Sequence, residues 1–406
     1  MPSLKHRLRD LGIVRPAWAV FRRNQLLARY EKRREHYARI AEERKLVYRE
    51  RDAVTALRER LAKRGYAPKK KSIGDIHTFA WIPMINWHEA LLPDLRELGP
   101  VSLFDYVQHG FRWQDFLELP KNGPQKRQQM NALLLDSVRE AHARQPIDWM
   151  FVYANGSEAE NATLDRIAND FGFPIVMMCL DDKQSWDLDV VGGQNLGQVD
   201  IAPHFDLCWT SARVACEWYM AENAIPIYLP EGFEQTTFRR SGRAKDIGVS
   251  FIGGAYGFRP NVIEYLRRNR IDVEVFGSAW GRPLDLNGQV DLFNRSRINL
   301  GMGGIDYSEE LTNVKGRDFE VPGTGGGMYL TSFNPDLAQH FDVGREIACY
   351  RNRSEMVELI RYYLARIEEA EAVAEAAYRR CVAEHRWRHR YERICRAIGI
   401  IKETNE

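Results

Sequence analysis

The chain has 406 residues, of which 44% are hydrophobic and 28% are charged, and its formal net charge at pH 7 is +2. These values are ordinary for a globular protein of two or three domains. The longest apolar runs, such as residues 174–180, are far shorter than the roughly 18–20 residues of a membrane span, which excludes that class; Arg15 and Pro16 interrupt the first apolar stretch, so we expect no signal peptide.

The small net charge hides an asymmetry along the chain. Residues 1–71 contain 22 Lys and Arg against 8 Asp and Glu, whereas the rest of the chain contains 36 against 48. A basic extension therefore precedes an acidic body. Such an extension can bind nucleic acid, an anionic membrane surface or an acidic partner.

The six cysteines form no CxxC pair. Cys179 lies in an apolar run and is expected in a core. This usage is typical of a reducing compartment, and it predicts neither a disulfide framework nor a structural zinc site. We therefore expect a cytoplasmic protein.

The extension, residues 1–71, is expected to be helical up to residue 66. From Arg15 to Arg64 it contains one proline and no glycine, and its apolar residues recur mostly at spacings of three, four and seven. This stripe fits a coiled-coil hairpin or dimer seam, a helix on a membrane surface, or a helical appendage packed on the body. Residues 65–71 then form a linker.

From residue 72 the pattern changes to short apolar strands that alternate with amphipathic helices. Up to residue 235 it predicts strands over 77–83, 101–106, 148–153, 174–180, 205–210 and 227–229, with helices over 87–98, 124–144, 158–171 and 213–223. This alternation predicts a parallel sheet with helices on both faces. The polar segment 231–246 is the expected interdomain linker.

The alternation starts again at residue 247. It predicts strands over 247–252, 273–276, 298–302, 328–332 and 347–349, and helices over 259–269, 291–297, 315–324, 354–365 and 368–384. A closing helix at 387–398 lies in a C-terminal piece, 386–406, that we expect to pack back on the body. The fold class is thus α/β, with two Rossmann-like domains, 72–235 and 236–385, after the basic helical extension.

Ligands of such sheets bind beyond the carboxyl ends of the strands, and glycine-rich turns follow two strands of the second domain. Gly253 and Gly254 precede a helix that Arg259 opens, and Gly303 lies in the turn 301–306. Turns without side chains let the backbone approach a phosphate, and a helix N-terminus favours an anion. A tight turn without a ligand fits the first stretch equally well, and a plain turn is the alternative for the second.

A third candidate site is the helix expected at 315–324. Lys315 and Arg317 could neutralise a diphosphate, since a guanidinium suits bidentate phosphate contacts, and Glu320 could accept hydrogen bonds from ribose hydroxyls. Lys315 and Arg317 are two positions apart and cannot share one helix face, whereas Arg317 and Glu320 are three apart and can. A surface ion pair between Arg317 and Glu320 is the alternative.

In the first domain, Asp181 and Asp182 directly follow an apolar strand. Two carboxylates at a strand end could supply a general base or contact an acceptor hydroxyl. They could equally cap the next helix. A lone histidine is more often structural, but the further candidates for a base are His88, His109, His204 and Glu231.

The sequence at 313–331 resembles the core motif of GT-B glycosyltransferases of the group 1 family, especially their CgeB-like, spore-maturation branch. The matching residues are Arg317, Phe319, Glu320, the glycines 325–327 and the strand MYLTSF. The resemblance covers about 150–395, and it includes the segments 204–233, 251–259, 334–364 and 384–394.

This resemblance implies a GT-B fold, in which two Rossmann-like domains face a cleft and the C-terminal one binds a nucleotide sugar. By the same resemblance Glu320 binds the donor ribose, Arg317 lies near the diphosphate, and Gly253 and Gly254 line the donor site. The family needs no bound metal for its donor, because helix dipoles and basic groups stabilise the diphosphate. We therefore expect no cofactor and no metal.

One position departs from the family's pattern. Related retaining enzymes carry a second glutamate eight positions before the ribose-binding one, and this chain has Thr312 there, with Glu309 and Glu310 out of register. Retention and inversion of the anomeric configuration therefore both stay open. If the enzyme inverts, Asp182 or Asp181 is the expected base.

These observations lead to the hypothesis of a hexosyltransferase-type enzyme of polysaccharide biosynthesis, with a glycan, lipid-linked or protein acceptor. Residues 1–71 would hold it at the inner face of a membrane or at a partner, a second copy included. The alternatives are a nucleotide-sugar epimerase-like enzyme, a catalytically degenerate GT-B scaffold and a nucleic-acid binder. The last is disfavoured, because the acidic body carries no nucleic-acid-binding motif.

Overall fold

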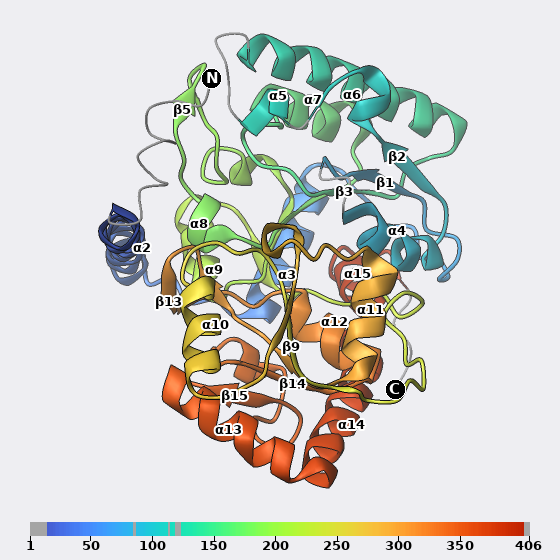
Figure 1. The fold of residues 1–406 in the computed structure, drawn as a ribbon. Coiled ribbons are helices and arrows are strands. Elements are labelled where there is room, and N and C mark those ends of the chain that lie inside the picture. The colour runs from blue at the N-terminus through green and yellow to red at the C-terminus, as the bar shows by residue number, and fades with distance from the viewer. Residues whose placement is uncertain (1–13, 84–86, 113, 118–122, 402–406) are drawn as a thin grey trace. The chain divides into compact units, whose positions relative to one another are not determined.

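The structure is a computed structural model that describes residues 14–83, 87–112, 114–117 and 123–401, and the chain divides into two compact units (Figure 1). The C-terminal unit combines the chain up to Glu35 with Gly232–Arg386, and the N-terminal unit combines His36–Glu231 with the chain from Trp387 onward. The basic extension is divided between the two units and forms no unit of its own.

The N-terminal unit is built on a six-stranded parallel sheet of strand order β2-β1-β3-β4-β7-β8. Its strands are β1 (Thr78–Trp81), β2 (Val101–Phe104), β3 (Trp149–Val152), β4 (Ile175–Cys179), β7 (Leu207–Thr210) and β8 (Pro226–Tyr228). Apolar residues of α3 (Glu50–Lys63), α4 (His88–Glu97) and α15 (Trp387–Ala397) share one core with this sheet. In Figure 1, α6 (Gly123–Arg144) and α7 (Asn161–Phe171) lie on the opposite side of the sheet.

The C-terminal unit is built on a five-stranded parallel sheet of order β10-β9-β11-β14-β15. These strands are β9 (Ile247–Ile252), β10 (Glu274–Phe276), β11 (Ser296–Leu300), β14 (Met328–Ser332) and β15 (Ala348–Tyr350). One face packs on α10 (Arg259–Arg268), α13 (Arg353–Ala365) and the start of α14 (Ile367–Glu384). The other packs on α11 (Leu286–Arg295) and α12 (Arg317–Thr324). Two parallel, helix-covered sheets confirm the predicted fold class.

The sequence interpretation missed two short hairpins and misplaced one helix. The hairpins are β5 (Val190–Val191) with β6 (Gln194–Asn195), and β12 (Gly304–Ile305) with β13 (Ser308–Thr312). Helix α11 begins at Leu286 and not at 291, because the carboxylate of Asp285 accepts a hydrogen bond of 2.8 Å from the backbone N–H of Gly288 and so caps an earlier turn.

The helix expected over the extension is interrupted. Helix α2 (Val14–Arg44) ends at Arg44, is followed by Lys45, a non-glycine residue with φ of 54°, and α3 begins at Glu50. Leu57 and Leu61 of α3 are fully buried in the core of the N-terminal unit. Of the alternatives for the extension, α3 therefore supports a helical appendage packed on the body.

The arginines of the extension donate to backbone carbonyls in the N-terminal unit. Arg44 donates to Ala221 at the end of α9 (Ala215–Ala221), Arg58 donates to Arg396 and Ala397 at the end of α15, and Arg60 donates to Phe205 and Asn223. Carbonyls at helix ends lack partners within the helix and carry partial negative charge. Part of the positive charge of residues 1–71 therefore stabilises the protein's own body.

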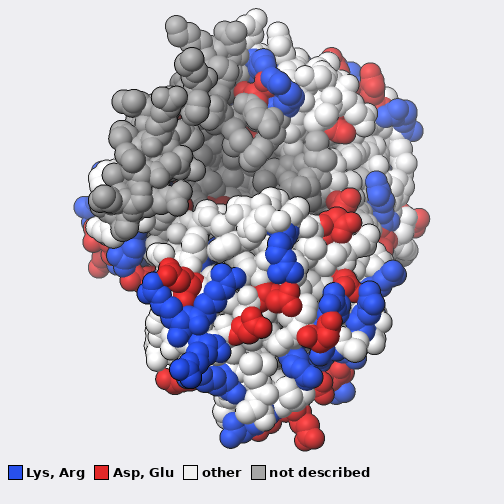
Figure 2. Space-filling model, in the orientation of Figure 1, with Lys and Arg blue, Asp and Glu red and all other residues white. Residues whose placement is uncertain are grey.

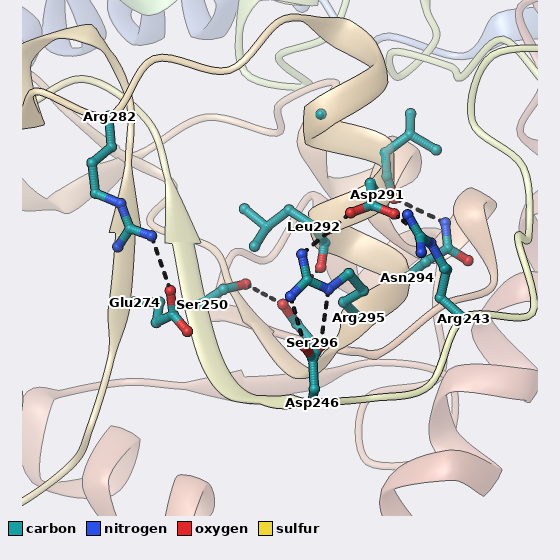
Figure 3. Close-up of polar contacts among 12 residues, drawn as sticks. Arg243, Asp246, Ser250, Glu274, Arg282, Asp291, Leu292, Asn294, Arg295 and Ser296 are labelled. Atoms are coloured by element: carbon teal, nitrogen blue, oxygen red, sulfur yellow. Dashed lines mark hydrogen bonds and ion pairs between the residues drawn. The ribbon is translucent and has the colours of Figure 1, made fainter.

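The residues just before β9 are fixed to helix α11 by ion pairs (Figure 3). Arg295 of α11 donates to Asp246, just before β9, and also lies 3.4 Å from Asp291. Arg243 donates to the same Asp291 over 2.9 Å. The end of the segment expected as a linker is therefore part of this unit.

All six cysteines are buried, and none of them forms a disulfide bond. Within the described part of the chain, no helix is long and apolar enough to cross a membrane. The same residues contain no group of three or more His, Cys, Asp or Glu side chains that could hold a metal ion.

Candidate functional site

The glycine turns of the C-terminal unit lie at the carboxyl ends of its parallel strands. Gly253 follows β9 and Gly301 follows β11, and the two strands are neighbours in the sheet. Helices α10 and α12 start at this same edge, because each runs back to the amino end of the next strand. The edge thus combines glycine turns with two helix N-termini, an arrangement that favours anions.

Arg259, the first residue of α10, folds back over the glycine turn. Its Nη1 lies 3.4 Å from the carbonyl oxygen of Gly254, and its guanidinium lies 4.3 Å from the ring centroid of Tyr256. A Cβ on Gly253 would come within 3.3 Å of Nη1, so the missing side chain makes room for the guanidinium. The buried Nε of Arg259 has no hydrogen-bond partner among the described residues.

Arg317 and Glu320 share one face of α12, as predicted from their spacing. The Arg317 guanidinium lies over the ring of Phe293, 5.0 Å from its centroid, and lies 3.3 Å from the amide oxygen of Gln289. Burial raises the pKa of the Glu320 carboxyl, and the charge of Arg317 opposes this shift. The predicted ion pair therefore exists, but Glu320 is mostly buried, with a side chain that is 19% exposed.

The two arginines belong to one electrostatic site. Burial lowers the pKa of Arg259, and the positive charge of Arg317 lowers it further, while Tyr256 opposes both effects. Two like charges that act on each other in this way disfavour the charged forms, and a bound anion would relieve that repulsion. Gly253, Gly254 and Arg259 are thus in contact at this edge, and Arg317 is near enough for its charge to act on Arg259.

The start of α12 differs from the expectation in one respect. Lys315 precedes the helix, which begins at Arg317, so the argument from one helix face does not apply to Lys315. Its backbone N–H donates to the carboxylate of Asp318 over 2.8 Å, and the Tyr329 hydroxyl donates to the same carboxylate over 2.8 Å. Burial raises the pKa of Asp318 to about 6.

Sequence reasoning missed Asp318 and Tyr329, although Asp318 lies inside the quoted motif. It also missed Gln289, because the predicted start of α11 lay after it, and Phe293, which lay inside the predicted helix but was not assigned to the site. Asp318 positions the first turn of α12, while Gln289 and Phe293 position the guanidinium of Arg317.

Gly303 connects three segments at the same edge. Its N–H donates to the hydroxyl of Ser332 at the end of β14 over 2.9 Å, and its carbonyl accepts from the N–H of Asn313 over 3.0 Å. Both contacts are structural, so Gly303 fixes the ends of the hairpin β12–β13 beside the arginines.

Thr312 is buried, and the two glutamates near it are used in ion pairs on β13. Glu309 pairs with Arg353 of α13, and Glu310 pairs with Arg23 of α2. Both glutamates that precede Thr312 on β13 are thus paired with arginines.

In the N-terminal unit, Asp181 and Asp182 have different surroundings. Asp182 is fully buried, opens α8 (Asp182–Ser185), and accepts hydrogen bonds from Thr210 and, over 2.6 Å, from Tyr219. Burial raises its pKa to about 6. Asp181 is partly exposed and makes no side-chain cap to the helix, and its carboxylate accepts from Gln184 over 3.0 Å. Asp181 is therefore the more accessible carboxylate.

Tyr153 is a second titratable group near Asp181. Burial raises the pKa of Tyr153, which follows β3, and the charges of Asp181 and Glu231 raise it further. Tyr153, Asp181 and Glu231 follow β3, β4 and β8, so these groups gather at the carboxyl edge of this sheet. The histidines make local contacts: His88 bonds the carbonyl of Ile82, His204 pairs with Asp165, and His109 stacks on Phe104.

A cavity of about 370 Å³ lies at the opposite, amino edge of the C-terminal sheet. Among its lining residues, Arg240 pairs with Glu375 and Lys245 pairs with Glu371. The carbonyl of Gly325, at the C-terminal end of α12, accepts from Arg240. Its cations are thus neutralised by the protein, unlike Arg259 at the carboxyl edge.

The sequence and the fold were compared with known proteins. Residues 259–396 match the model of a family described as glycosyl transferase-like. This segment begins at Arg259 and includes the whole of α12. A comparison with curated proteins gave no match.

Two solved proteins share the fold. Sucrose-phosphate synthase from Thermosynechococcus elongatus is similar with a TM-score of 0.52 and 10% identity, over 79% of this chain and 98% of that chain. HepE from Anabaena, solved with UDP and glucose, gives 0.51 and 12% over 80% and 100%. HepE with UDP-glucose gives 0.50 and 11% over the same shares. The likeness confirms the predicted GT-B fold.

Proposed function

We propose that this chain, which has the GT-B fold and a glycosyl transferase-like C-terminal segment, transfers a hexose from a nucleotide-diphosphate sugar to an acceptor. The observation that carries the proposal is the pair of guanidinium groups, Arg259 and Arg317, beside the turn Gly253–Gly254. Two cations at two helix N-termini of one sheet edge suit a diphosphate. The binding of UDP and of UDP-glucose by HepE supports the same reading.

In this proposal the protein acts by holding the donor and by stabilising charge. Arg259 and Arg317 bind the diphosphate, and they stabilise the negative charge that the leaving nucleoside diphosphate gains as the sugar bond breaks. Glu320 accepts hydrogen bonds from the ribose, and Lys315 adds positive charge beside α12. The basic groups supply the stabilisation without a metal ion or cofactor.

For an inverting reaction, we propose that Asp181 takes the proton from the acceptor hydroxyl. Asp181 is partly exposed, whereas Asp182 is fully buried and hydrogen-bonded. Asp182 then has the positioning role, at the first turn of α8. The acceptor is a glycan, a lipid-linked sugar or a protein.

We place the enzyme in the cytoplasm, where six buried thiols stay reduced. Nucleic acid is not a proposed partner. Arginines of the extension donate to carbonyls of the body, and Lys or Arg and Asp or Glu side chains are interspersed on the part of the C-terminal unit that Figure 2 shows.

The test is an assay with UDP, GDP and dTDP sugars labelled in the sugar, with calorimetric binding of each nucleotide in parallel. Label that moves to an acceptor supports the transferase. Label that stays on the nucleotide as an altered sugar supports an epimerase-like enzyme, and no binding of any nucleotide supports a scaffold.

The matched variants for this test lie on one helix. Arg259→Gln should weaken nucleotide binding at least tenfold, because it removes a cation from the diphosphate. Arg268→Gln, at the other end of α10, removes an exposed cation that pairs with Glu264. It should bind nucleotide like the wild type.

A further inference from the structure

The hairpin β12–β13 leaves and rejoins the chain at the donor site. It follows β11 and Gly303, and residues 313–316 lead from it directly into α12. Arg317 therefore comes only five residues after the hairpin ends at Thr312. A shift of the hairpin would move both Gly303 and the first turn of α12.

The hairpin also interlocks with the turn that carries Arg259. A Cβ on Gly257 would lie 1.6 Å from the carbonyl oxygen of Asp306, and a Cβ on Gly304 would lie 2.6 Å from the ring of Phe258. Backbone therefore contacts backbone or ring at both points without intervening side chains. Since Phe258 immediately precedes Arg259, the hairpin supports both arginines of the proposed donor site.

Residues of α2 between positions 18 and 23 contact this hairpin. The ring of Trp18 meets Tyr307 edge to face, with centroids 5.4 Å apart, and Arg23 forms an ion pair with Glu310. Burial raises the pKa of Asp306, and the charge of Arg22 opposes this shift. These contacts lie within the C-terminal unit.

The hairpin is held on another side by α13. Arg353, the first residue of that helix, pairs with Glu309 through two nitrogen atoms. The two adjacent glutamates of β13 thus pair with distant parts of the chain. Glu310 pairs with Arg23, which precedes the hairpin in sequence, and Glu309 pairs with Arg353, which follows it. The α2 contact comes from the N-terminal segment of this unit, which precedes its sheet in the sequence.

We propose that Trp18 and Arg23 of α2 are positioning residues of the donor site, which act by fixing the hairpin β12–β13 against the Arg259 turn. This inference rests on the proposed function, because it assigns a role at that same nucleotide site. It gives the N-terminal helix a part in donor binding. The affinity for nucleotide then depends on residues more than 230 positions away in sequence from Arg259.

The experiment measures UDP binding by calorimetry and the melting temperature of full-length variants. Trp18→Ala and Arg23→Glu should each weaken UDP binding about fivefold or more. The charge-swapped double variant, Arg23→Glu with Glu310→Arg, should recover most of the lost affinity. The control is Arg34→Glu, which breaks a pair with Glu31 inside α2, away from the hairpin, and it should leave UDP affinity unchanged.

The outcomes separate the two proposals. Wild-type protein that binds none of UDP, GDP and dTDP overturns the proposed function, and this inference with it. Wild type that binds, with Trp18→Ala and Arg23→Glu binding equally well, overturns only the inference. A lower melting temperature without a change in affinity, or a double variant no better than Arg23→Glu, also overturns it. If Trp18→Ala does not fold, Trp18→Phe and the charge-swapped pair decide the question.

Discussion

The Nε atom of Arg317 lies 3.6 Å from a carboxylate oxygen of Glu320, three residues further along α12. The two groups have different roles in the proposed site. Arg317 attracts the diphosphate, and Glu320 accepts hydrogen bonds from the ribose. Their contact also lets each charge partly neutralise the other where both side chains are largely buried. Removing either one should therefore have a different effect on binding and on stability.

Glu320→Gln should raise the KM for the donor about tenfold, or about 1.4 kcal/mol, because an amide is a weaker acceptor for ribose hydroxyls than a carboxylate. Its melting temperature should stay at or above that of the wild type, since burial already disfavours the charged carboxyl. Arg317→Met should weaken binding and also lower the melting temperature, because it leaves Glu320 without its ion pair.

The comparison variant for this pair is Glu264→Gln, which disrupts the exposed Arg268 pair. It should change neither KM nor melting temperature measurably. Donor kinetics that are unchanged in Glu320→Gln would remove this residue from the nucleotide site.

The sequence predicted the edge of the proposed donor site from local signals. A strand, a glycine turn and a helix start follow one another in the chain at 247–259, and Arg317 and Glu320 are three residues apart on one helix. Parallel strand order then brings these segments to one edge. By contrast, Gln289 and Phe293 reach Arg317 from another helix, and no local pattern encodes that contact.

The hairpin β12–β13 was missed for a similar reason. Its strand β12 has two residues, which is too short for an alternating pattern, and the hairpin contacts Gly257 and residues of α2 that are distant in sequence. Such contacts between distant segments leave glycines as their only trace in the sequence.

Gly257 offers a test of the close contact between this hairpin and the Arg259 turn. Gly257→Ala should lower the free energy of unfolding by about 3 kcal/mol or more, because a methyl group would meet the carbonyl oxygen of Asp306 in addition to the strain of a φ of +62°. It should also weaken UDP binding. Both quantities can be measured, by urea unfolding and by calorimetry.

Gly281→Ala is a control that has the backbone strain of Gly257→Ala without the contact with Asp306. Gly281 has a similar φ of +73°, but no atom lies within 4 Å of its added Cβ. Its cost should be about 1 kcal/mol, with UDP affinity unchanged. An equal loss in the free energy of unfolding for the two variants would show that the hairpin makes no close contact with Gly257.

The charge of the extension predicted a binding surface, yet composition alone cannot say what the charges contact. Arg60 donates to the carbonyls of Phe205 and Asn223 over 3.0 and 2.8 Å. Arg60→Gln should therefore lower the free energy of unfolding by about 1–2 kcal/mol, since hydrogen bonds from a charged donor are lost. Arg49→Gln, which removes an exposed pair with Asp52, should cost less than about 0.5 kcal/mol. Equal costs in urea unfolding would contradict this role for Arg60.

Asp182 should make the stability of the protein depend on pH. Burial raises its pKa from 3.8 to about 6 in the folded state, so the folded chain binds more protons than the unfolded chain between these values. The stability that this proton contributes is fully present below pH 3.8 and is lost as the pH rises through 6.

The isosteric variant Asp182→Asn removes this titration while it keeps groups that can bond Thr210 and Tyr219. The unfolding free energy of the wild type minus that of the variant should fall by about 2 kcal/mol between pH 4.5 and pH 7.5. Asp136→Asn, at an exposed carboxylate that pairs with Arg139, should give a nearly constant difference. A difference for Asp182→Asn that is flat, or that increases with pH, would mean that this carboxyl is charged in the folded protein over the whole range, and Asp182 would then return as a candidate base beside Asp181.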